Sequence, residues 1–112
     1  MQIIEKPWGK EEVIEINTQY MVKKLTMLKG HRCSLQYHQK KTETIYVLSG
    51  ELNIYLGDHK DNLSCRTYYP GDSITISNFQ IHRMEGKTDS VYLEASTPEM
   101  DDVIRLKDDY KR

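Results

Sequence analysis

Short runs of β-forming residues, separated by glycine-containing turns, repeat along most of this chain. The runs are rich in Val, Ile, Leu, Thr and Tyr, and apolar residues at helical spacing are hard to find. We predict strands at residues 11–17, 20–28, 33–38, 43–49, 51–57, 64–69, 73–77, 80–86 and 90–96. Glycines at the intervening turns can adopt positive φ and join neighbouring strands antiparallel. The pattern therefore predicts an all-β fold, a single antiparallel β-barrel or jelly roll.

One such barrel would use nearly all of the 112 residues, so we expect a single domain over residues 1–112. The segment 100–110 is more ambiguous. Its Val103, Ile104 and Leu106 fit either a last edge strand or a short helix, followed by a frayed end at Lys111 and Arg112.

The charge pattern argues against nucleic acid and membrane partners. The formal net charge is -1, basic and acidic residues are interspersed, and there is no Lys/Arg block of the kind that neutralises phosphates. No apolar run approaches the roughly 18 residues needed to cross a bilayer, and residues 1–6 lack a leader-like pattern. We therefore expect a cytoplasmic protein.

The two cysteines and the tyrosines add two smaller expectations. Cys33 and Cys65 lack CxxC spacing, so we expect two buried, unbridged thiols rather than a disulfide. The chain has eight tyrosines against one Phe and one Trp, and such amphipathic rings suit strands that face a polar cavity or a wet interface.

Metal-capable side chains cluster between Gly30 and Gly50. Gln36 and His38 share one face of a predicted strand, and Glu43 can join them after a turn. His82, near the start of a later strand, is a fourth candidate ligand. The set suits Zn, Fe, Mn, Co or Ni, although lone histidines are often hydrogen-bonded structural residues and spacing alone leaves both interpretations open. His31 and His59 lie in predicted turns, where we expect exposure.

Two motifs resemble those of the cupin superfamily. Gly30-x5-Gln36-x-His38-x4-Glu43-x6-Gly50 resembles the first cupin motif, with Gln in place of the first His. Gly71-x5-Ser77-x-Phe79-x2-His82 resembles the second, with Ser77 and Phe79 in place of its Pro and Gly. The resemblance implies a cupin barrel that holds one divalent metal ion on Gln36, His38, Glu43 and His82.

Further segments, in order along the chain, resemble the C-terminal cupin domain of type II phosphomannose isomerases. They are Lys6-Pro7-Trp8-Gly9, residues 20–26, Ser34-Leu35-Gln36-Tyr37-His38 with Glu43, and Asp102-Val103-Ile104-Arg105. In that family the cupin domain follows a guanylyltransferase domain, and phosphomannose isomerases bind zinc through Gln, His, Glu and His. The chain departs from the family after His38, where an arginine and an aromatic residue are lost, and between Glu94 and Asp101, where the loop is shorter. No Gly-rich phosphate loop is present, so we do not expect sugar-nucleotide synthesis from these residues alone.

The resemblance implies sugar-phosphate isomerisation, such as interconversion of mannose 6-phosphate and fructose 6-phosphate. In that chemistry the metal polarises the carbonyl and a base moves a proton between adjacent carbons. Glu94 is a candidate base if its side chain points inward, and otherwise a solvated carboxylate. One of the adjacent Lys23 and Lys24 would enter the barrel, and that lysine or Arg105 could hold the phosphate.

Some of these assignments have structural alternatives. Arg105 could equally pair with Asp101 or Asp102 at the surface, and Trp8 fits core packing better than sugar stacking. Two other functions also stay open. One is metal-dependent sugar binding without turnover. The other is iron-dependent oxygenation on the two histidines and the carboxylate, against which Gln36 argues by occupying a position that oxygen would need. Finally, we expect a homodimer, because exposed edge strands need cover.

Overall fold

The structure, a computed structural model, describes residues 2–110. Every regular element in that range is a strand, and the paired strands run antiparallel. The strands are β1 (Gln2–Lys6), β2 (Gly9–Ile16), β3 (Met21–Met27), β4 (Leu35–Tyr37), β5 (Glu43–Ser49), β6 (Leu52–His59), β7 (Asn62–Tyr68), β8 (Ser73–Ile76), β9 (Ile81–Gly86), β10 (Ser90–Ser96) and β11 (Ile104–Lys107). Residues 2–110 contain no helix that is long and apolar enough to span a membrane.

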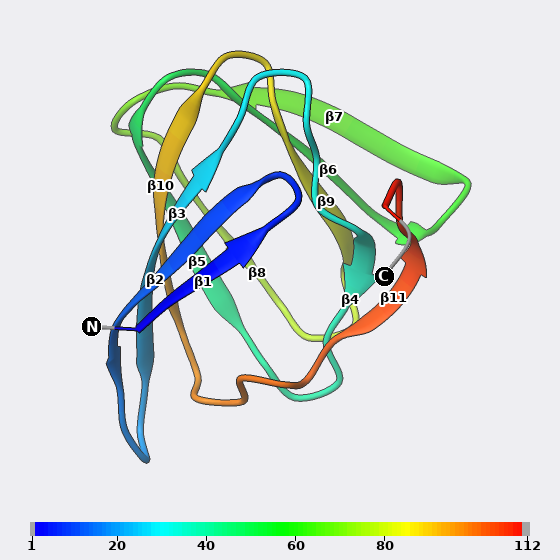
Figure 1. Cartoon of the computed structure of the whole chain (residues 1–112). Coiled ribbons are helices and arrows are strands. Elements are labelled where there is room, and N and C mark those ends of the chain that lie inside the picture. Colours follow the sequence, from blue (N-terminus) through cyan, green and yellow to red (C-terminus); the bar gives the residue numbers. More distant parts are fainter. Residues whose placement is uncertain (1, 111–112) are drawn as a thin grey trace.

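The strands form two sheets that face each other (Figure 1). The order is β1-β2-β3-β10-β5-β8 in the six-stranded sheet and β11-β4-β9-β6-β7 in the five-stranded sheet. Strands distant in sequence are neighbours, such as β3 with β10 and β4 with β9, which is the jelly-roll arrangement. The predicted all-β antiparallel jelly roll is confirmed.

All nine predicted strands are present, with their ends displaced by at most two residues. The prediction missed β1, which forms a hairpin with β2 at the edge of the six-stranded sheet. The ambiguous C-terminal segment contains a strand rather than a helix, because β11 pairs with β4. The predicted frayed end at residues 111–112 lies outside the described residues.

The space between the sheets is apolar at one end and polar at the other. Side chains on β3 and β10 alternate between buried and more exposed positions, as the two-residue period of a strand requires. The buried apolar side chains form one cluster, namely Trp8, Leu25, Met27, Cys33, Ile45, Val47, Leu52, Ile54, Tyr68, Ile76, Met84 and Tyr92. Further along the same inner face, Lys23 of β3 lies opposite Glu94 of β10, and both are buried, as is Glu43 of β5. The fold therefore places charged groups inside one end of the jelly roll.

The expectations for the cysteines and for two histidines meet mixed outcomes. Cys33 is buried as predicted, but Cys65 is exposed, because β7 is an edge strand with a largely exposed surface; both are free thiols. His59 is exposed, whereas His31 is half-buried, contrary to prediction. The reason is the C-terminal segment, whose Tyr110 stacks on the His31 ring and shares a hydrogen bond with its Nδ1.

Candidate metal centre and cavity

His38, Glu43 and His82 meet between the two sheets. His38 follows β4, Glu43 begins β5 of the opposite sheet, and His82 lies on β9. Glu43 Oε1 lies 3.0 Å from His82 Nε2 and 3.4 Å from His38 Nε2, and the imidazole centroids are 5.0 Å apart. All three residues are buried, with His82 at 0% exposure. Residues 44 positions apart in the chain thus converge on one point.

The hydrogen bonds of the two rings assign their protons. His38 Nδ1 donates to the main-chain oxygen of Asp102, and His82 Nδ1 donates to that of Gln80 at 2.9 Å. In a neutral imidazole the other nitrogen then carries a lone pair. Both Nε2 atoms therefore present lone pairs to Glu43 Oε1, and these three buried atoms have no hydrogen-bond partner within residues 2–110.

This donor set fits a divalent cation. Three facing lone pairs repel one another unless a positive charge lies between them. With metal–ligand bonds of about 2.0–2.2 Å, neighbouring ligand atoms of a tetrahedral zinc site are about 3.3 Å apart. The two contacts of Glu43 Oε1 bracket that separation, and the three ligand atoms lie within 4.8 Å of one another. Nδ1–H···O=C bonds of this kind are common outer-sphere contacts of histidines that bind metal in proteins.

Gln36, the fourth sequence-predicted ligand, lies beside this cluster. It is paired with His82 across β4 and β9, and it lines the cavity next to the cluster. Its Oε1 accepts a hydrogen bond of 2.7 Å from Ser34 Oγ. Because an amide oxygen has two lone pairs, one stays available after this bond. Ser34 thus orients the amide in the way that outer-sphere groups orient ligands.

The turn before His82 keeps a glycine-like backbone in spite of its sequence. Phe79 occupies the position where the second cupin motif has Gly, and it adopts φ of 66°. Its N–H donates to the main-chain oxygen of His38 at 2.7 Å, and Gln80 N–H closes the turn on Ser77 oxygen at 3.3 Å. The left-handed conformation costs a residue with a Cβ about 1–2 kcal/mol. The turn therefore ties the two histidine-bearing segments together at the expense of local strain.

A buried ion-paired cluster adjoins the three candidate ligands. Lys41 Nζ lies 3.1 Å from Glu94 Oε2 and 3.6 Å from Glu43 Oε2, and all three side chains are buried. Burial and the Glu43 charge raise the pKa of Glu94 to about 8. Burial opposes ionisation of Glu43, but the adjacent His38 and His82 imidazoles and the charge of Lys41 hold its pKa well below the usual range. The structure thus turns Glu94 inward, the orientation that its candidacy as a base required.

Sequence reasoning missed Lys41. Burial lowers its pKa, but the charges of Glu94 and Glu43 outweigh that effect and raise it. A signal was available, because Lys41 stands two residues before Glu43 and therefore on the same side of an extended chain. Its buried position shows that the basic residues after His38 are not simply a solvated loop.

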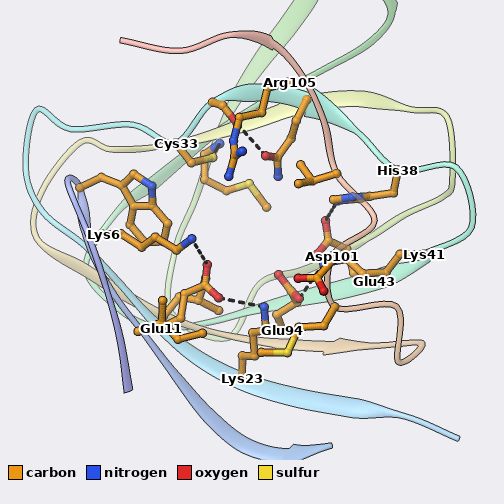
Figure 2. Close-up of a pocket in the computed structure, with 18 of the residues that line it drawn as sticks. Lys6, Glu11, Lys23, Cys33, His38, Lys41, Glu43, Glu94, Asp101 and Arg105 are labelled. Carbon is orange, nitrogen blue, oxygen red and sulfur yellow. Dashed lines mark hydrogen bonds and ion pairs between the residues drawn. The ribbon is translucent and has the colours of Figure 1, made fainter. Parts of the chain in front are cut away.

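These groups line a cavity of about 420 Å³ at the polar end of the fold. Figure 2 shows Lys6 and Glu11 across this cavity from His38 and Glu43, with Lys23 and Glu94 between them. Glu11, a second residue that sequence reasoning missed, pairs with Lys23 at 2.8 Å and with Lys6 at 3.8 Å. Apolar side chains, among them Trp8 and Tyr92, supply the remaining wall.

The remaining sequence candidates divide between the cavity and the surface. Lys23 enters the cavity, whereas its neighbour Lys24 is half-buried and does not line it, because adjacent strand residues face opposite ways. The structure therefore brings Lys23, and not Lys24, to the cavity. Arg105 lines the cavity. Within the described part of the chain it forms no ion pair with Asp101 or Asp102, so the predicted alternative of a surface salt bridge is wrong. Trp8 is 3% exposed and packs in the core cluster, as the packing interpretation expected.

Comparison with known proteins identifies the family of this chain. The protein family described as mannose-6-phosphate isomerase C-terminal matches residues 1–108. The chain is 31% identical over 112 residues to "Mannose-1-phosphate guanylyltransferase 2" of Escherichia coli O157:H7, which covers 95% of this chain and 22% of that protein. The chain therefore spans about a fifth of the length of the curated relatives that it matches.

Solved structures share the fold at low identity. KdgF from Halomonas sp. superposes with a TM-score of 0.76 at 16% identity, over 90% of this chain and 91% of that one. An RmlC-like cupin from Shewanella frigidimarina superposes with a TM-score of 0.77 at 19% identity, over 89% and 86% of the two chains. This chain is a cupin domain, and it belongs to the mannose-6-phosphate isomerase C-terminal family.

Proposed function

We propose that this domain is a metal-dependent aldose–ketose isomerase that acts on a sugar phosphate, with mannose 6-phosphate and fructose 6-phosphate as the first pair to test. One observation carries the proposal. Three unpartnered lone-pair atoms of His38, Glu43 and His82 converge beside a buried Lys41–Glu94 pair, in a cavity open to small molecules. The names of the relatives, which refer to mannose 1-phosphate chemistry, support a phosphorylated hexose.

His38, Glu43 and His82 would hold the metal ion, with Gln36 as the fourth ligand, and we propose zinc first. Glu43 contributes one negative charge and the other three ligands contribute none, so a divalent ion keeps about one positive charge in a partly desolvated site. Such an ion polarises a carbonyl oxygen bound to it. A site of this charge favours an oxygen-rich, anionic ligand over a neutral apolar one.

In this proposal Glu94 and Lys41 move the protons. Glu94 Oε2 takes the proton from the carbon next to the carbonyl and returns it to the former carbonyl carbon. Lys41 Nζ, 3.1 Å away, stabilises the carboxylate and can pass a proton between the two substrate oxygens. No proton is gained or lost overall, and the aldehyde carbon is reduced as its neighbour is oxidised. A pKa of about 8 for Glu94 lies near neutral pH, where general acid–base catalysis is most effective.

Arg105 is the group best suited to hold the phosphate. Arg105 lines the cavity, and the fork of donors on its guanidinium matches phosphate oxygens. Lys6 lies across the cavity from His38 (Figure 2), with a long 3.8 Å contact to Glu11 that a phosphate could replace. Lys23 is held more closely by Glu11, at 2.8 Å, and serves to orient that carboxylate.

The test uses the purified chain, stripped with a chelator and reloaded separately with Zn, Mn, Co, Ni and Fe(II). Mannose 6-phosphate is added in D2O, and proton NMR follows both ketose formation and deuterium uptake at the carbon next to the carbonyl. Interconversion that is lost in Glu94→Gln, and kept in the exposed Glu15→Gln control, supports the proposal. Arg105→Gln should raise KM for the phosphorylated sugar and leave KM for free mannose unchanged.

Other results identify the alternatives. Thermal stabilisation by sugar phosphate without deuterium uptake would indicate a metal- and sugar-binding domain without turnover. Substrate-dependent oxygen consumption by the iron-loaded protein alone would replace isomerisation with oxygenase chemistry, which a two-histidine, one-carboxylate set also permits.

We also propose a homodimer. β1 is an edge strand of the six-stranded sheet and exposes Ile3, while Tyr46 and Leu48 of β5 are exposed further along that sheet. A second copy would cover this edge and these side chains. Sedimentation velocity at micromolar concentration should show a dimer, and a monomer would contradict the proposal.

A further inference from the structure

The loop between His38 and Glu43 is tied to the C-terminal segment by a single side chain. The main-chain N–H groups of Gln39, Lys40 and Lys41 all donate to the carboxylate of Asp102, at 3.1, 2.7 and 2.9 Å. Three consecutive N–H groups that converge on one carboxylate form an anion-binding concavity, here filled from within the chain. Hydrogen bonds to an ionised acceptor are about twice as strong as neutral ones.

Asp102 also forms a hydrogen bond with His38, one of the candidate metal ligands. The main-chain oxygen of Asp102 accepts the Nδ1–H of His38, which leaves His38 Nε2 facing Glu43. Asp102 therefore touches the loop through its side chain and the imidazole through its backbone. The carboxylate fixes where the backbone of residue 102 lies, and the position of its carbonyl oxygen follows.

Asp102 belongs to a wall of the cavity. Asp101, Val103 and Arg105 line the cavity on either side of it, and β11 pairs Arg105 with Gln36 of β4. In Figure 1 this segment, in orange, runs from the end of β10 past the base of the jelly roll to β11. A substitution at Asp102 would therefore alter the positions of the cavity wall, the His38 ring and the loop that carries Lys41.

We propose that Asp102 is a positioning residue, which sets the His38 ring and the Lys41 loop by locking residues 39–41 to the C-terminal wall. A loop at the surface could satisfy these N–H groups with water, so hydrogen bonding alone does not require the carboxylate. Its effect is to hold one geometry, in which Nε2 of His38 and Nζ of Lys41 both face Glu43. For its consequence on metal affinity, the inference rests on the proposed function.

A second hydrogen-bonded contact of the same loop, between Thr42 and Thr97, offers a matched control for the Asp102 variants. Thr97 Oγ1 accepts the N–H of Thr42 at 3.1 Å, and Thr97 N–H donates to the Thr42 oxygen at 3.1 Å. Thr97→Val removes a side-chain acceptor from the same loop with little change in shape. It leaves His38 and the Asp102 carboxylate untouched.

The experiment compares the full chain with Asp102→Ala, Asp102→Asn and Thr97→Val. The first readout is the tautomer of His38, taken from long-range proton–nitrogen NMR spectra of the metal-free protein. The second is amide hydrogen exchange at residues 39–42. The third is the dissociation constant for Co²⁺, together with the visible spectrum of the bound ion.

In the wild type we expect a single Nδ1-protonated tautomer of His38. In Asp102→Ala we expect a mixture of tautomers, at least tenfold faster exchange at residues 39–41 and ten- to hundredfold weaker Co²⁺ binding, the usual effect of losing an outer-sphere contact. Asp102→Asn should show the same changes to a smaller extent, and it carries the test if the alanine variant does not fold. Thr97→Val should speed exchange at Thr42 alone.

Two results would overturn the inference: an unchanged His38 tautomer in both Asp102 variants, or the same effects in Thr97→Val. Failure of the metal proposal looks different. A wild type that binds no Co²⁺ refutes the metal site, whereas the tautomer and exchange readouts still decide the role of Asp102.

Discussion

Glu94 provides a quantitative test of the buried charge cluster. It is 6% exposed, and burial together with the Glu43 charge raises its pKa from 4.5 to about 8. Between these values the folded state keeps a proton that the unfolded chain has released. The unfolded state therefore binds fewer protons, and stability must fall as the pH rises through this window.

The expected slope is about 1.4 kcal/mol per pH unit in the middle of the window. From pH 5.5 to pH 7.5 the wild type should thus lose about 3 kcal/mol through Glu94. Lys41, whose pKa is raised, and Glu43, whose pKa is lowered, keep their charges over this range. Glu94→Gln keeps the shape and the acceptor for Lys41 Nζ but has no proton to release. The wild-type advantage over Glu94→Gln should therefore shrink by about 3 kcal/mol over this range.

The assay is urea denaturation followed by circular dichroism, with a chelator present, at pH 5.5, 6.5 and 7.5. The difference between the free energies of unfolding of the two proteins cancels the contributions of other groups that titrate in the same range. Glu15→Gln, which neutralises an exposed carboxyl of β2, should change stability by less than about 0.5 kcal/mol at each pH. A wild-type advantage that is constant with pH, or that grows as pH rises, would refute the reasoning.

Three other predictions test the scaffold. Gly50→Ala should cost about 2 kcal/mol more than Gly30→Ala in urea denaturation. Both glycines have φ of +78°, but a Cβ at Gly50 would lie 2.1 Å from a backbone oxygen, while nothing lies within 4 Å at Gly30; equal costs would contradict the packing there. Phe79→Gly should be about 1 kcal/mol more stable than Phe79→Ala, because only Ala keeps the strain of positive φ. The reverse order of stability in the same assay would contradict a left-handed conformation at residue 79. A thiol reagent should label the exposed Cys65 at once and Cys33 only on unfolding, because Cys33 is buried and burial raises its pKa to about 11. Rapid labelling of both thiols in the native protein would contradict the burial of Cys33.

Much of the architecture follows from local sequence. Runs of β-branched and aromatic residues between glycines predict the strands, because both the two-residue period and positive φ are properties of a few neighbouring residues. β1 escaped prediction, since residues 2–6 have little pattern of their own and form a strand by pairing with β2. The C-terminal segment behaves likewise, because only its pairing with β4 selects strand over helix.

The chemical identity of the candidate site was also visible in sequence, but its assembly was not. Spacing placed Gln36, His38 and Glu43 near one hairpin and offered His82, from a later strand, as a fourth candidate, and the cupin resemblance strengthened this set. In the structure, pairing of β4 with β9 sets His82 beside Gln36, and the packing of the two sheets brings Glu43 onto both imidazoles. Neither contact has a local signature.

The sequence by itself determined the strands, the turns and the kinds of side chain available for chemistry, because these depend on short-range backbone preferences. Tertiary structure alone decided that Lys23 points inward and Lys24 does not, that Lys41 joins Glu94, and that Asp102 receives three N–H groups from a distant loop. The physical reason is that register and sheet packing are set by burial over the whole molecule. A one-residue shift of β3 or β10, for example, would send Lys23 or Glu94 to the opposite face of the sheet.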